Sequence, residues 1–84
     1  MRQITLNDGT VLQDSYVIQD GNILWVYIYA AISFEDAFLL LCNPDNVKKV
    51  TLEQFGEKTV FKGFTELFCI RKEDGGFISA GVRK

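Results

Sequence analysis

The stretch from Ile23 to Ala30 lies in the longest uncharged run of the chain, and β-branched and aromatic residues dominate it. Side chains of a strand alternate between its two faces, so both faces of this stretch are apolar. One face carries Leu24, Val26, Ile28 and Ala30, and the other carries Ile23, Trp25, Tyr27 and Tyr29. This pattern predicts a central strand with a layer packed over each side.

Two shorter strands are expected before this central strand. Gln3–Leu6 alternates as a strand, and Asn7–Gly9 is a hairpin signal because its residues tolerate positive φ. A second strand spans Val11–Ile18 with an interruption at residues 13–15, where a bulge or bend is expected. Asp20–Asn22 then turns the chain into the central strand. The first third therefore predicts a three-stranded meander.

A single short helix is expected next, over about Phe34 to Cys42. Ser33 is a typical N-cap, and an acid three residues later, Asp36, favours the positive end of the helix dipole. Asn43-Pro44 ends the helix, because the residue before proline is pushed out of helical conformation. Four residues have the spacing of one apolar helix face: Phe34, Ala37, Phe38 and Leu41.

Strands over residues 47–55, 59–70 and 77–83 complete the chain, with a bend allowed at Gly63. The expected order is β-β-β-α-β-β-β. It predicts an α+β fold in which two three-stranded antiparallel β-meanders flank one short α-helix, as one bent sheet or as a small sandwich or barrel. The length of 84 residues predicts a single domain, 1–84.

Charge gives little support to nucleic-acid binding. The formal net charge is −2, and the basic residues are scattered along the chain. The pairs Lys48-Lys49, Arg71-Lys72 and Arg83-Lys84 form a basic patch only if the fold brings them together. Solvated strand edges are the favoured interpretation, because lysine also deters unwanted strand pairing.

The cysteines and the N-terminus indicate an intracellular protein. Cys42 and Cys69 each have apolar neighbours, which is typical of buried free thiols. Met1–Leu6 lacks the apolar segment of a signal peptide, and the run Ile23–Ile32 is too short to span a bilayer. We therefore expect a soluble, cytoplasmic protein.

No constellation for catalysis is present, so we expect no enzyme, no cofactor and no metal site. The chain has no histidine, no cysteine cluster and no glycine-rich phosphate loop. Glu35-Asp36 is interpreted as a helix start and not as a catalytic pair. Glu73–Gly76 and Asn43–Asn46 are interpreted as turns and not as cation sites.

The row Trp25, Tyr27 and Tyr29 is the most specific feature for function. It predicts either a contact surface for a protein or a second core face covered by another layer. Stacking on bases or sugars is the weaker interpretation. Leu39 and Leu40 lie outside the helix stripe, so each needs a further partner in this chain or in another subunit. These five residues are the candidate protein-contact residues.

Several segments resemble small uncharacterised proteins of bacterial prophages: Ile4–Thr10, Asn43–Asn46, Val50–Leu52, Phe61–Thr65 and Phe77–Lys84. The resemblance implies a phage-associated structural or accessory role, with no catalytic residue to carry over. We therefore expect a non-enzymatic protein–protein interaction or assembly module, acting as a homo-oligomer or in a complex. The alternative is a small inhibitor or regulator that binds a host protein through an acidic surface made by Asp14, Asp20, Glu35 and Asp36.

Overall fold

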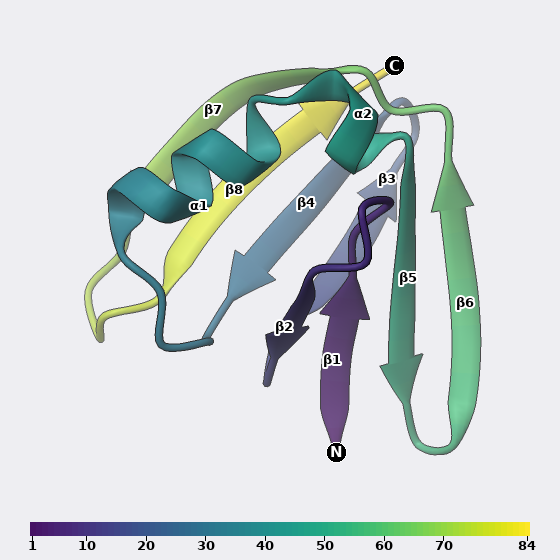
Figure 1. Ribbon diagram of the computed structural model, residues 1–84, viewed down its shortest axis with the longest axis horizontal. Coiled ribbons are helices and arrows are strands. Elements are labelled where there is room, and N and C mark those ends of the chain that lie inside the picture. The colour runs from purple at the N-terminus through teal and green to yellow at the C-terminus, as the bar shows by residue number, and fades with distance from the viewer.

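The computed structural model describes residues 1–84 and contains two four-stranded antiparallel sheets and two short helices (Figure 1). Sheet I has the strand order β2-β1-β5-β6, and sheet II has the order β3-β4-β8-β7. The elements are β1 (Arg2–Thr5), β2 (Val11–Gln13), β3 (Tyr16–Asp20), β4 (Ile23–Ile28), α1 (Phe34–Leu41), α2 (Pro44–Val47), β5 (Lys49–Gln54), β6 (Glu57–Lys62), β7 (Glu66–Lys72) and β8 (Ile78–Arg83). An α+β fold with antiparallel sheets is confirmed.

The expected pair of three-stranded meanders around one helix is wrong, and neither sheet closes into a barrel. The first meander divides at Asp14-Ser15, because β2 pairs with β1 while β3 pairs with β4. Asp14 has a φ of 57°, which turns the strand out of sheet I. Ser15 is fully buried; its hydroxyl donates to the Gln13 carbonyl at 2.9 Å and accepts the Tyr29 N–H at 3.1 Å. This corner places β3 in sheet II.

The second expected meander also divides between the sheets. The hairpin β5–β6 belongs to sheet I, and β7–β8 belongs to sheet II. Gly63, with a φ of 94°, lies at the crossing, and the side chain of Phe64 next to it is fully buried. An aromatic anchor beside a flexible residue lets the chain leave one sheet and enter the other.

A second helix, α2, stands where a turn was expected. Asn43 caps it by accepting the Asp45 N–H at 3.0 Å, and Pro44 occupies its first turn, where proline is well tolerated. Pro44 therefore starts a helix as well as ending α1. Asn46 is buried, and its side-chain amide donates to the Leu40 carbonyl at 2.9 Å, which ties α2 to α1.

The core lies between the inner faces of the two sheets and the two helices. Sheet I contributes residues such as Ile4 and Leu52, and sheet II contributes Leu24, Val26 and Val82. These positions alternate with less buried ones along their strands, as expected for sheets with one covered face. The helices contribute Ala37, Leu41 and Val47.

The expected N-cap of α1 is confirmed, since the Ser33 hydroxyl accepts the Asp36 N–H at 3.1 Å. The buried stripe differs from the expected one: Ala37 and Leu41 are buried, but Phe38 is 43% exposed. The expectation of a buried Cys42 is also wrong, because this residue caps the end of the helix and is exposed. Neither helix has the length and apolar character needed to cross a membrane.

Candidate functional site

The face of sheet II that points away from the core carries a cluster of aromatic rings. The prediction of a layer over each side of the central strand is therefore wrong on this side, where Tyr29 is 46% exposed and Ile18 is 51% exposed. Trp25 and Tyr27 are half-buried, mostly by neighbouring rings. We call this surface the outer aromatic face and define it by Tyr16, Trp25, Tyr27, Tyr29, Phe68 and Phe77.

Four of these rings form a stacked row. The centroids of Tyr16 and Tyr27 lie 4.9 Å apart, and those of Tyr29 and Phe77 lie 4.7 Å apart. Tyr16 and Tyr29, whose centroids are 6.2 Å apart, link the two pairs. Rings that stack on one another cover much of their π-faces, so the row presents ring edges and hydroxyl groups outward.

Trp25 and Phe68 form a second group, whose rings meet edge to face with centroids 5.7 Å apart. A bulge between Leu67 and Cys69 lets Phe68 reach this face. Both rings close over Gly81 of β8, where a Cβ atom would lie 2.8 Å from the Phe68 ring and 2.9 Å from the Trp25 ring. The two rings can therefore pack over this position because Gly81 has no side chain.

Charged side chains at the rim are mostly neutralised by one another. The Arg83 guanidinium donates to Glu66 at 2.9 Å, and this hydrogen bond and charge hold the pKa of the Glu66 carboxyl below its ordinary 4.5. Glu73 accepts from the Ser79 hydroxyl and from Arg71, and these contacts, in that order, also lower its pKa. Arg2 differs, because its guanidinium lies 4.1 Å from the Tyr16 ring centroid and makes no ion pair.

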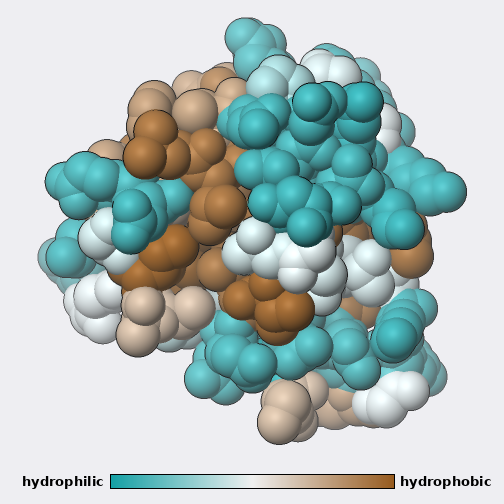
Figure 2. Space-filling view, in the orientation of Figure 1, coloured by the Kyte–Doolittle hydropathy of each residue, from teal (hydrophilic) through white to brown (hydrophobic).

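The structure thus brings Trp25, Tyr27 and Tyr29 onto one face but places the leucine candidates elsewhere. Leu39 is 63% exposed on α1, and Figure 2 shows apolar side chains gathered on the side of the molecule where α1 lies. Leu40 is half-buried and packs against the core. Because α1 packs on the inner side of sheet II, Leu39 and the outer aromatic face point in different directions.

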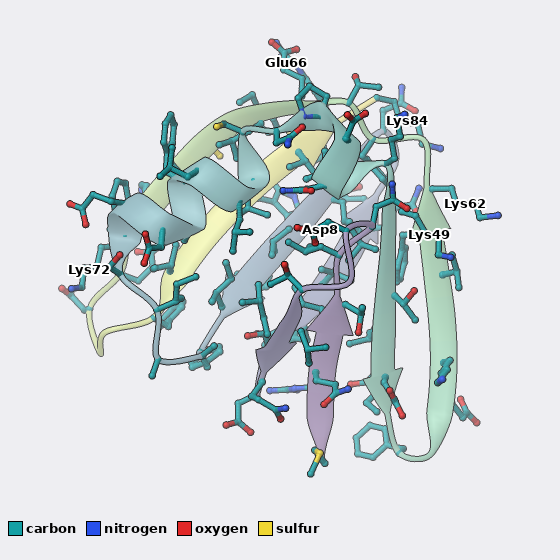
Figure 3. The ribbon with its side chains drawn as sticks, in the orientation of Figure 1. Asp8, Lys49, Lys62, Glu66, Lys72 and Lys84 are labelled. Atoms are coloured by element: carbon teal, nitrogen blue, oxygen red, sulfur yellow. The ribbon has the colours of Figure 1, made fainter.

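Charged candidates do not gather into one site. The fold brings the basic residues together only in part: Lys49 lies opposite Lys62, and the Lys84 side chain lies against Gly63, whereas Lys72 lies on the other side of the molecule (Figure 3). Asp20 is the last residue of β3, whereas Asp14 lies at the corner before its first residue, so the length of the strand separates the two carboxylates. No group of three or more metal-ligating side chains lies together.

Sequence reasoning missed Tyr16, Phe68 and Phe77 as members of this face. A signal for Tyr16 exists in the turn at Gly21-Asn22, because a two-residue loop fixes the hairpin register and places Tyr16 opposite Tyr27. Phe68 had no such signal, since its orientation depends on the bulge.

No protein-family model matches the chain, and no curated protein or solved structure matches it either. The physical character of the surface is therefore the basis for a proposal on function.

Proposed function

We propose that the protein is a non-enzymatic protein–protein interaction module that binds its partner through the outer aromatic face. The observation that carries this proposal is a row of tyrosine and phenylalanine rings on a sheet face that no helix or second sheet covers. Tyrosine and tryptophan combine large contact area with a polar handle, and they are enriched where partners bind most tightly.

The stacking geometry favours a protein over a nucleic acid or a sugar. Binding of bases or sugar rings needs aromatic π-faces open to the ligand. Here Tyr16 stacks on Tyr27, and Tyr29 stacks on Phe77, so the π-faces that meet within each pair are covered by the other ring. Ring edges and hydroxyls suit the mixed apolar and hydrogen-bonding surface of a protein partner.

The setting we propose is the assembly of a phage particle or a prophage-associated complex, on the basis of the resemblance described above. A partner that covers only the sheet meets a face of about 20 Å by 20 Å, from the spacing of strands and residues. This is a small interface, so we expect moderate affinity unless the partner also contacts the loops around the sheet.

An affinity capture from the native host, with matched variants, tests this proposal. Tyr29→Lys places a charge within the stacked row at an exposed position, and Thr59→Lys places the same charge on β6, outside the face. We expect the wild type and Thr59→Lys to retain the same partner and Tyr29→Lys to lose it, with circular dichroism showing that both variants fold. Equal retention by both variants contradicts the proposal.

A further inference from the structure

The turn between β5 and β6 presents an aromatic ring in a conformation that disfavours it. Gln54 and Glu57 are the last pair of the hairpin, so Phe55 and Gly56 form a two-residue loop. Their φ values of 54° and 75° match a turn that prefers Asn, Asp or Gly at its first position. The Phe55 side chain is 87% exposed, so it gains no packing within the chain to offset this conformation.

A hollow of about 250 Å³ lies directly beside this ring and is lined by Met1, Arg2, Asp14, Gln54 and Phe55. Asp14 and Phe55 are the only non-glycine residues of the chain with positive φ. Unfavourable backbone conformations persist most often at binding surfaces. Figure 1 shows that the β5–β6 turn, the start of β1 and the end of β2 lie at the same end of the molecule.

The hollow is lined by one basic and one acidic side chain, Arg2 and Asp14. Arg2 and Asp14 are both exposed, and neither takes part in any of the three ion pairs of the chain. The Arg2 guanidinium lies over the Tyr16 ring, 4.1 Å from its centroid, but it has no carboxylate partner. A twofold axis through such a surface can set the cation of each copy against the anion of the other copy.

The shape of the hollow is compatible with the same arrangement. A cavity of about 150 Å³ accommodates benzene, so a hollow of about 250 Å³ has room for a phenyl ring. Phe55 is an exposed ring next to a hollow of its own chain, so a twofold axis at this end can place the ring of each copy in the hollow of the other.

We propose that this end of the molecule is a self-association surface, in which Phe55 of each copy fills the hollow of the other and Arg2 faces the second copy's Asp14. Only Arg2 of these residues touches the outer aromatic face, through the Tyr16 ring, and the pairing does not depend on the proposed function. The small contact implies weak, concentration-dependent association.

Sedimentation equilibrium from about 10 μM to about 1 mM, the range of weak association, tests the proposal with Phe55→Asn. Asn-Gly is a preferred pair for this turn, so we expect the variant to raise the Tm by about 5 °C. We expect the same variant to weaken dimerisation by about tenfold or more. Opposite effects on stability and association rule out misfolding as the cause.

Charge and surface controls complete the experiment. Arg2→Glu sets two acids against each other and is expected to weaken the dimer, whereas Lys72→Glu at the end of β7, on the other side of the molecule (Figure 3), leaves it unchanged. The proposal is overturned if the wild type is a monomer at every concentration, or if Phe55→Asn dimerises as tightly as the wild type. The proposal is also overturned if the chain stays monomeric and Phe55→Asn fails to capture a different protein that the wild type captures. The β5–β6 turn is then the binding surface for that protein.

Discussion

The two sheets have similar inner faces and very different outer faces. Inside, Ile4 and Leu52 of sheet I and Leu24 and Val26 of sheet II share one core. Outside, sheet I presents mostly polar residues, with Gln3 opposite Glu53, and Glu53 in turn opposite Lys58. Sheet II presents the stacked rings of the outer aromatic face instead.

This difference separates what folding requires from what it does not. Both inner faces must be apolar, because a small domain obtains its stability from a single buried core. Sheet I folds with a polar outer face, so folding does not require a row of aromatic rings on the outer face of sheet II. The rings on sheet II are the feature on which the proposed contact surface rests.

The largest effect is expected at the shared inner face. Leu24→Ala in sheet II and Leu52→Ala in sheet I each remove a buried side chain, so each is expected to lower the free energy of unfolding by about 3 kcal/mol. Urea denaturation measures both. If only one sheet responds, the two inner faces do not form a single core, and the comparison fails.

A smaller loss is expected at the point where the rings meet the strand. Gly81→Ala drives a methyl group into Phe68 and Trp25, and overpacking of this kind costs about 2 kcal/mol. Combining it with Phe68→Ala is expected to recover part of that loss, which a double-mutant cycle reports as coupling. Strict additivity of the two changes would mean that the rings do not rest on Gly81.

Substitutions on the outer faces are expected to change the free energy of unfolding less than substitutions on the inner faces. Trp25 is half-buried against Phe68, so Trp25→Ala is expected to cost about 1–2 kcal/mol, below the value for a core tryptophan. Val60→Ala on the outer face of sheet I is expected to change stability by no more than about 0.5 kcal/mol. A loss at Trp25 as large as that at Leu24 would show that the outer aromatic face belongs to the core.

The smallest expected effect is a loss of thermal stability at low pH. Glu66 and Glu73 at the rim of sheet II have pKa values lowered by their hydrogen-bonding partners. A lowered folded pKa stabilises the native state above the ordinary value of 4.5, and this contribution is lost as the pH falls through the folded pKa. Thermal melts below pH 4.5 are expected to show a small loss that Glu66→Gln and Glu73→Gln together reduce.

Turns, caps and alternation could be predicted because they depend on neighbouring residues. Ser33 caps α1 through a hydroxyl three residues from its donor, and Leu24, Val26 and Ile28 alternate with the ring row as expected. The division of each meander between two sheets could not be predicted. It depends on Ser15 reaching the backbone of Tyr29 and on Phe64 entering the core, which are contacts between distant parts of the chain.

The candidate site was predicted in part for the same reason. Trp25, Tyr27 and Tyr29 share a face because they belong to one strand, but Phe68 joins them through a bulge and a strand pairing that no local pattern indicates. Leu39 and Leu40 had the same helical pattern, yet one is exposed and the other packs against the core.

The order of residues by itself determined the cap and start of α1, the turns between paired strands, and which side chains of β4 share a face, because these follow from backbone geometry over a few residues. It did not indicate α2, and it predicted only bends at the breaks that separate β2 from β3 and β6 from β7. Only the tertiary structure decided which strands share a sheet and which apolar face stays uncovered. Alternation marks a face as apolar, but whether another layer covers that face depends on how distant segments pack.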